Sequence, residues 1–212
     1  MGRVLQETAA SAVGFFETQF RRQVGEGDFA LNPFETLALP YVRGRVLDLG
    51  CGLGNLSLAA AEHGCSVLAL DASPTAVERV RFAAAGLDVR AERVELAGYR
   101  IAGDFDTIVA IGLLMFMARD PARALLGEIR AHVAPGGCAI VNVLTEGTTY
   151  LEMFGAAPYY LFGARELEEA FAGWQILQWR LDRFEAPGGT EKRFATIVAR
   201  HDSGKHKERH SA

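Results

Sequence analysis

The stretch that decides the fold of this chain runs from residue 46 to residue 54 and reads Val46-Leu47-Asp48-Leu49-Gly50-Cys51-Gly52-Leu53-Gly54. A short apolar strand with an acidic residue near its end passes into three alternating glycines, and a helix-like apolar segment follows at residues 56–61. Glycine permits positive φ angles and close approach of the backbone to a ligand. The stretch therefore predicts a strand, a glycine turn and a helix, with a nucleotide-like ligand at the end of the strand, beside the N-terminus of the helix.

A second apolar strand, at residues 65–70, ends at Asp71. A carboxylate in that position can accept hydrogen bonds from both hydroxyls of a ribose. A dinucleotide fingerprint would need a further glycine at position 55 or 57, but these positions hold Asn55 and Ser57. Taken alone, the glycine turn could be purely structural and Asp71 could be a helix cap. Together the two features favour a site for a different cofactor that carries a ribose.

Composition limits the class of protein. The 212 residues carry a net charge of −4 and half of them are hydrophobic, which predicts a folded domain with a sizeable core and disfavours nucleic acid as a partner. The three cysteines, Cys51, Cys65 and Cys138, lack the spacing of a disulfide framework or a metal site, so we expect no bound metal and a reducing, cytoplasmic location. The longest apolar run, residues 108–118, is too short to span a bilayer, and the N-terminus lacks the apolar core of a signal peptide. We therefore expect no membrane partner.

The chain alternates between predicted strands and helices. Strands are expected at residues 45–50, 65–71, 105–111 and 138–144, with a third strand and its exit loop at 87–96 and a turn at 135–137. Helices are expected at 8–27, 33–39, 55–63, from Ser73 onward, at 121–133 and at 165–171. Two further strands, 174–184 and 194–201, flank a short Pro-Gly-Gly loop and predict an antiparallel hairpin. This order predicts an α/β fold with a doubly wound, mostly parallel, seven-stranded Rossmann-like sheet closed by a C-terminal antiparallel hairpin. We expect an N-terminal helical cap or lid at 1–43, a ligand-binding domain at 44–201 and a disordered polar tail at 202–212.

The pattern Asp48-x-Gly50-x-Gly52-x-Gly54 resembles motif I of the class I S-adenosylmethionine (SAM) methyltransferases, and Asp71 follows at the tip of the next strand. The resemblance implies a domain that uses SAM and releases S-adenosylhomocysteine (SAH). It implies that the motif surrounds the methionine end of the cofactor, that Asp71 lies at the ribose and that Glu95 lies near the adenine, although Glu95 could equally be a surface acid. The full set of expected cofactor-binding residues is Asp48, Gly50, Gly52, Gly54, Asp71, Ala72, Glu95, Leu96, Ile111 and Gly112.

Several stretches are similar to the tellurite-resistance methyltransferases of the TehB type. They are residues 113–117, Phe162 with Glu166-Leu167, Gly173-Trp174 and residues 193–200, and the similarity covers roughly residues 44–200. It implies methyl transfer to a small-molecule acceptor, such as the chalcogen oxyanion tellurite. That family carries a His-Arg pair in the hairpin between its last two strands. The corresponding hairpin here contains no histidine and leaves Arg183 and Arg193 as its cationic candidates.

Arg193 and Tyr160 are the expected catalytic, acceptor-side residues. Arg193 could bind an anion or be an ordinary exposed strand residue, and Tyr160 lies in the loop after the fifth strand. Phe16, Phe20 and Phe116 could surround the sulfonium through cation–π contacts, but core packing is favoured for all three. Two other functions stay open: methyl transfer to an unrelated N, O or thiol acceptor, and a non-catalytic SAM-binding module that regulates a partner. A monomer or a homodimer is expected.

Overall fold

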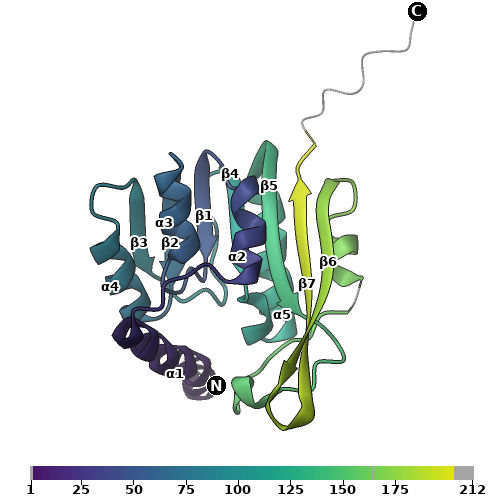
Figure 1. The fold of residues 1–212 in the computed structure, drawn as a ribbon. Coiled ribbons are helices and arrows are strands. Elements are labelled where there is room, and N and C mark those ends of the chain that lie inside the picture. The colour runs from purple at the N-terminus through teal and green to yellow at the C-terminus, as the bar shows by residue number, and fades with distance from the viewer. Residues whose placement is uncertain (1, 164, 203–212) are drawn as a thin grey trace, which may run out of the picture.

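The computed structural model describes residues 2–163 and 165–202, with side chains from residue 14 onward, and contains one seven-stranded sheet in the order β3-β2-β1-β4-β5-β7-β6 (Figure 1). The first five strands pair in parallel, and β7 pairs antiparallel with both β5 and β6. The strands are β1 (Arg45–Leu49), β2 (Ser66–Asp71), β3 (Val89–Arg93), β4 (Phe105–Ile111), β5 (Val133–Leu144), β6 (Gln175–Ala186) and β7 (Thr190–Arg200). The predicted fold class, including the terminal hairpin, is confirmed.

Helices cover both faces of the sheet. The α-helices are α1 (Gly2–Glu26), α2 (Pro33–Ala38), α3 (Asn55–Glu62), α4 (Pro74–Ala83), α5 (Arg119–His132) and α6 (Glu166–Ala170), and the 3-10 helices are η1 (Leu39–Tyr41), η2 (Leu114–Phe116), η3 (Glu152–Phe154) and η4 (Pro187–Gly189). One apolar core lies between the sheet and α3 and α4, and includes Leu56 and Val80. The other lies between the sheet and α5 and α6, and includes Leu125 and Leu167. The strands of the sheet's centre are therefore buried on both sides, as parallel strands require.

Local sequence signals account for the starts of α2 and α4. The Asn32 side chain accepts hydrogen bonds from the backbone of Phe34 and Glu35, and the Glu35 carboxylate accepts one from the Asn32 N–H. Ser73 caps α4 by accepting a hydrogen bond from the Ala76 N–H at 3.1 Å, and proline occupies the first helical position. Both predicted helix starts are confirmed.

The structure corrects two predicted boundaries. The first helix begins at Gly2 instead of residue 8. The predicted turn at 135–137 belongs to the irregular beginning of β5, which starts at Val133. Two hydrogen bonds of 2.8 Å hold this segment against His201. The Gly136 N–H donates to the His201 carbonyl, and the His201 N–H donates to the Gly137 carbonyl. Hydrogen bonds with His201, just after β7, thus extend β5 into a segment that sequence alone favours as a turn.

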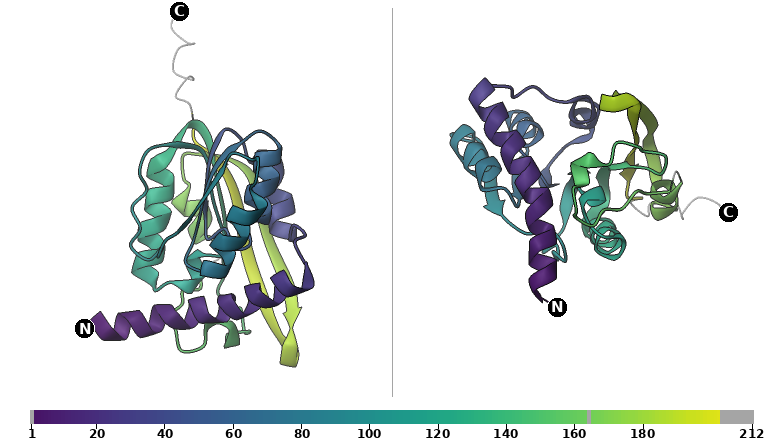
Figure 2. Two further views of the ribbon diagram at one scale, coloured as in Figure 1. Left: turned by 90° about the vertical axis from the view of Figure 1, so that its left-hand side faces the viewer. Right: turned by 90° about the horizontal axis from the view of Figure 1, so that it is seen from below.

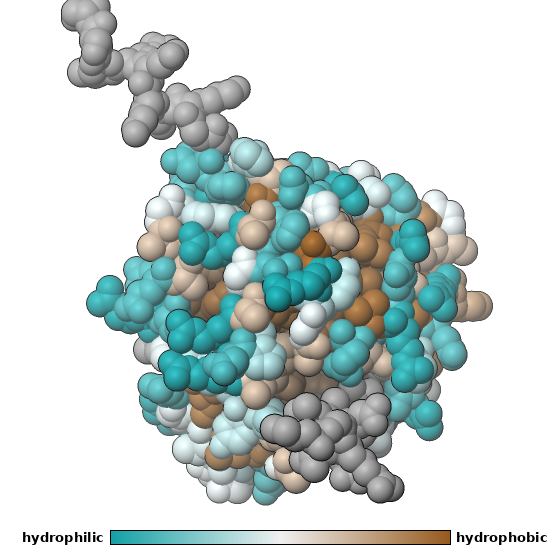
Figure 3. All heavy atoms as spheres, turned by 180° about the vertical axis from the view of Figure 1, so that it is seen from behind, coloured by the Kyte–Doolittle hydropathy of each residue, from teal (hydrophilic) through white to brown (hydrophobic). Residues whose placement is uncertain are grey.

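Helix α1 lies across the edge of the sheet where β1, β2, β4 and β5 end, and the view from below shows it crossing that edge (Figures 1 and 2). Seen from behind, the surface is mostly hydrophilic, with smaller apolar areas between the polar side chains (Figure 3). None of the described helices is both long and apolar enough to cross a membrane. Of the predicted polar tail, residues 203–212 lie outside the described part of the chain.

Candidate active site

The turn after β1 contains three glycines with positive φ angles: 69° at Gly50, 53° at Gly52 and 75° at Gly54. A Cβ atom at Gly54 would lie 2.4 Å from a methyl carbon of Val80, so this glycine allows the start of α3 to pack against α4. A Cβ atom at Gly52 would lie 3.3 Å from the Phe20 ring of α1. The turn therefore needs glycine both for its backbone conformation and for close packing.

Asp71, at the tip of β2, joins the glycine turn to the start of α4. Its Oδ2 accepts a hydrogen bond from the Gly52 N–H at 2.9 Å, and its Oδ1 accepts one from the Ser73 N–H at 2.8 Å. Burial raises the pKa of Asp71 above its ordinary value, although these two N–H groups stabilise the charged form. Each carboxylate oxygen keeps a further lone pair, so the partly exposed group can accept additional hydrogen bonds.

Asp48 occupies a different environment, beneath the glycine turn. It is 5% exposed, and its Oδ2 accepts a hydrogen bond from the Ser57 hydroxyl of α3 at 2.6 Å. Burial raises the pKa of Asp48 to about 7, and the nearby charges of Glu35 and Asp71 act in the same direction. The structure thus gives Asp48 a clear role in joining β1 to α3, and its contact with a cofactor stays a prediction.

The other expected cofactor residues lie at neighbouring strand ends. The Ala72 carbonyl accepts a hydrogen bond from the Arg93 side chain at 3.1 Å. Glu95 is exposed and Leu96 is buried, in the segment that follows β3. Ile111 and Gly112 are partly exposed at the end of β4, which pairs with β1. Gly50, Gly52, Asp71, Ala72, Ile111 and Gly112 thus form a partly exposed edge beside a buried core.

Helix α1 contacts this edge through a side chain that sequence reasoning missed. Glu17 accepts hydrogen bonds from the Ser73 hydroxyl, at 2.5 Å, and from the Thr75 hydroxyl. It also pairs with Arg21 at 3.0 Å. Burial acts to raise the pKa of Glu17, but these hydrogen bonds outweigh it and the pKa lies below its ordinary value. The sequence offers no local signal for this contact because its partners lie on α4, more than fifty residues away.

Arg193 lies on β7, beside the loop that follows β5. Its N–H donates to the Thr148 hydroxyl at 3.0 Å, and its side chain lies against Gly147. The guanidinium group pairs with Oε1 of Glu191 at 2.5 Å, and Arg183 of β6 pairs with Oε2 of the same carboxylate. Arg183 and Arg193 are therefore both bound to one acid, which sequence reasoning did not single out.

Tyr160 connects the same loop to α6. Its hydroxyl donates to Glu166 at 2.6 Å, and its N–H donates to the Met115 carbonyl in η2 at 3.0 Å. Burial and the neighbouring Glu166 carboxylate raise the pKa of Tyr160. The hydroxyl is thus engaged by α6, and its expected contact with an acceptor stays a prediction.

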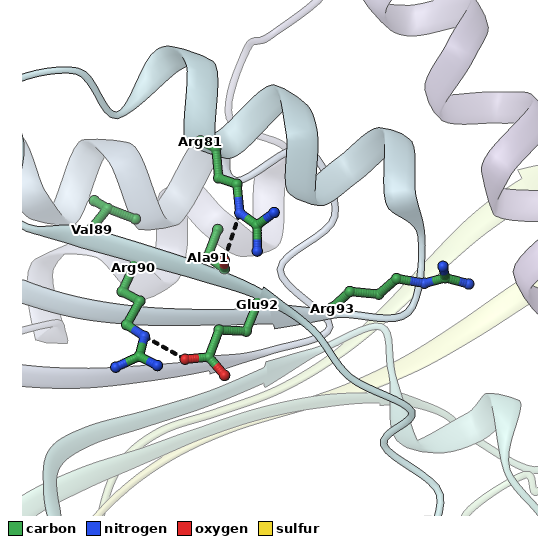
Figure 4. A pocket seen from close by; sticks show the side chains of 6 residues that line it. All are labelled: Arg81, Val89, Arg90, Ala91, Glu92 and Arg93. Atoms are coloured by element: carbon green, nitrogen blue, oxygen red, sulfur yellow. Dashed lines mark hydrogen bonds and ion pairs between the residues drawn. The ribbon is translucent and has the colours of Figure 1, made fainter.

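A shallow, open hollow lies elsewhere, on the outer edge strand β3 (Figure 4). The Arg81 side chain reaches from α4 to donate to the Ala91 carbonyl at 3.0 Å, and Arg90 pairs with Glu92 on the strand (Figure 4). The remaining lining residues are Val89 and Arg93. The hollow contains none of the expected site residues, and its charged groups protect an edge strand from pairing with other chains.

Comparison with known proteins agrees with the class that the fold and the glycine turn indicate. Residues 46–137 match the family model of a methyltransferase domain. The fold is also similar to that of a solved TehB structure. The resemblance to the class I SAM-dependent methyltransferases is therefore confirmed.

Three individual proteins illustrate the similarity. Hemagglutinin 1 of Eikenella corrodens is 29% identical over 138 residues, which cover 64% of this chain and 45% of that protein. The cypemycin N-terminal methyltransferase of a Streptomyces species is 34% identical over 99 residues, covering 46% and 40%. The probable SAM-dependent methyltransferase TehB of Haemophilus influenzae is 24% identical over 172 residues, covering 74% and 57%. The TehB crystal structure superposes with a TM-score of 0.70 at 22% identity, over 82% of this chain and 63% of that chain. The chain thus spans about half the length of these curated relatives.

Proposed function

We propose that the protein is a SAM-dependent methyltransferase that acts on a small-molecule acceptor. The observation that carries the proposal is the hydrogen bond between Asp71 and the Gly52 N–H, which joins the acid at the tip of β2 to the glycine turn after β1. Strand β1 lies between β2 and β4, and the order of the sheet reverses between β1 and β4, the point at which ligands of open α/β sheets bind.

The residues at this edge fit an adenosyl cofactor. The partly exposed Asp71 has lone pairs for the ribose hydroxyls, with Ala72 beside it, and Glu95 and Leu96 would lie near the adenine. Gly50 and Gly52 would border the methionine end, with Ile111 and Gly112 on the β4 side, while Asp48 and Gly54 would support the turn from below. Bound SAM would supply an electrophilic methyl group and leave as SAH.

Helix α1 is proposed as a cap over the cofactor. The Phe20 ring lies against Gly52. Glu17 accepts a hydrogen bond from the Ser73 hydroxyl, and the N–H of the same serine donates to Asp71. A helix in this position would exclude water from the reacting groups and keep the acceptor in line with the methyl group. Methyl transfer depends chiefly on such placement.

Two classes of acceptor follow from the comparisons and the site. The likeness to TehB supports an oxyanion such as tellurite, which needs a positive group nearby; Arg193 is the candidate for that group, and an oxyanion would have to compete with its partner Glu191. The cypemycin relative, by its name, methylates an N-terminus, and an unrelated N, O or thiol acceptor is the alternative. In either case Arg193 and Tyr160 are the proposed acceptor-side residues.

Calorimetry with SAM and SAH tests the proposal. Wild-type protein should bind both, and Asp71→Ala should bind them about 10- to 100-fold more weakly, because hydrogen bonds to a charged group are lost. Asp104→Ala, which removes a carboxylate that is 70% exposed, is the matched control and should bind as wild type does. Thermal unfolding of each variant checks that it is folded.

Failure of wild-type protein to bind SAM and SAH would contradict the proposal. Tight cofactor binding without turnover on any N, O, thiol or oxyanion acceptor, together with a stable co-purifying protein, would instead favour a regulatory SAM-binding module.

A further inference from the structure

An unbroken series of aromatic contacts leads away from the glycine turn. We call it the aromatic wall, and its members are Phe20, Phe16, Phe116, Phe154 and Tyr159. Successive ring centroids are separated by 5.8 Å, 4.8 Å, 5.2 Å and 4.3 Å, distances typical of favourable aromatic pairs. The series begins at the turn because Phe20 is the side chain that lies against Gly52.

The aromatic wall combines three segments of the chain. Two of its rings belong to α1, Phe116 belongs to η2 after β4, and the last two belong to η3 and the loop after β5. The wall therefore lies beyond the ends of β4 and β5. Asp71 lies on the other side of the point between β1 and β4 where the strand order of the sheet reverses. Buried Met115, Leu144 and Met153 pack in the same cluster as Phe154, so the wall is backed by apolar side chains.

Three positive groups near the loop after β5, Arg183, Lys192 and Arg193, already contact other protein groups. Glu191 pairs with Arg183 through one oxygen and with Arg193 through the other. The Lys192 ammonium group lies 4.9 Å from the centroid of the Tyr150 ring, and burial lowers its pKa. An oxyanion would have to compete with Glu191 for the arginines, whereas an uncharged ring would only have to pack against other rings.

We propose that the methyl acceptor is an uncharged compound with an aromatic ring that packs against the aromatic wall, and that Phe116 determines this specificity. The inference rests on the proposed methyltransferase function. A lone pair of an N, O or S atom on the ring compound forms the bond to the methyl carbon. The bond between methyl and sulfur breaks with its electron pair left on sulfur, and the proton of the acceptor atom passes to water.

Calorimetry on the SAH-loaded protein tests the inference without requiring turnover. The probes are 2-naphthol, its saturated counterpart decahydro-2-naphthol, and the oxyanions tellurite and selenite. We expect 2-naphthol to bind more tightly than its saturated counterpart, because only the aromatic ring gains ring–ring contacts, and we expect both oxyanions to bind more weakly than 2-naphthol.

Phe116→Leu keeps an apolar side chain but removes the ring, and should weaken 2-naphthol binding about five- to tenfold while leaving SAH affinity unchanged. Phe82→Leu is the matched control, because this ring on α4 is 87% exposed and lies outside the wall. Its affinity for 2-naphthol should equal that of wild type.

If wild-type protein does not bind SAH, the proposed methyltransferase function itself is contradicted. If SAH binds, the inference alone is overturned when tellurite or selenite binds more tightly than 2-naphthol, when 2-naphthol binds no better than its saturated counterpart, or when Phe116→Leu and Phe82→Leu give equal affinities.

Discussion

The turn after β1 and the loop after β5 lie at the same edge of the sheet, but they are held by different kinds of contact. The glycine turn is fixed by its own backbone conformation, by the Asp71 carboxylate of the neighbouring strand and by close packing against Val80. The loop after β5 is fixed by the Phe116 ring of η2, the Glu166 carboxylate of α6 and the backbone of β7. The comparison teaches that the cofactor half of the site is encoded locally, whereas the acceptor half depends on how distant segments pack.

The largest expected effect concerns the packing of the glycine turn. Gly54→Ala should lower the free energy of unfolding by about 3 kcal/mol or more, because it combines a positive φ angle with a Cβ atom 2.4 Å from Val80. Gly64→Ala is the matched control, since Gly64 has a φ of 85° but nothing within 4 Å of an added Cβ, and should cost only about 1 kcal/mol. Urea unfolding of both variants measures the difference. Equal losses would show that Val80 does not constrain the turn.

The second effect concerns the buried acid beneath that turn. Folded protein holds the Asp48 proton up to pH about 7, whereas the unfolded chain releases it near pH 3.8, so the folded state binds more protons between these values. The contribution of this group to the free energy of unfolding is therefore fully present below pH 4 and is lost as the pH rises from 4 through 7. Relative to wild type, Asp48→Asn should gain stability over that window, by an amount on the order of a few kcal/mol.

Unfolding measurements from pH 4 to pH 8 check this sign, with the exposed Asp88→Asn as the control that should follow wild type throughout. A constant difference between Asp48→Asn and wild type across the window would contradict the raised pKa.

The smallest effect concerns the helix that contacts both halves. If α1 caps the cofactor, Glu17→Gln should increase the rate of SAH dissociation about tenfold, because hydrogen bonds from Ser73 and Thr75 to a charged acceptor are weakened. Glu26→Gln, at the exposed end of the same helix, should leave the rate unchanged. Stopped-flow measurements decide between these outcomes, and identical rates for the two variants would rule out the cap.

Much of the fold follows from sequence because its signals are local. The apolar strand at 105–111, the caps at Asn32 and Ser73 and the Pro-Gly-Gly hairpin all lie where their patterns predict. The turn expected at 135–137 becomes the irregular start of β5, because Gly136 and Gly137 bond to His201, just after β7. Continuous pairing of β5 with β4 still begins at Cys138, as predicted. Glu17 was missed because its partners lie at the start of α4, more than fifty residues along the chain. Glu191 is close in sequence to both of its arginine partners, but only the register of the hairpin shows that their side chains meet.

The sequence by itself determined the strand, glycine turn and acidic strand tip, because positive φ angles and the two-residue period of a strand restrict these elements locally. It also determined the closing hairpin, through the residues of its loop. Only the tertiary structure decided that α1 crosses the edge of the sheet (Figure 2), that Phe16 packs against Phe116, and that Glu17 reaches the start of α4. These contacts form when the core brings distant segments together, and their geometry is set by packing, which residue patterns along the chain do not record.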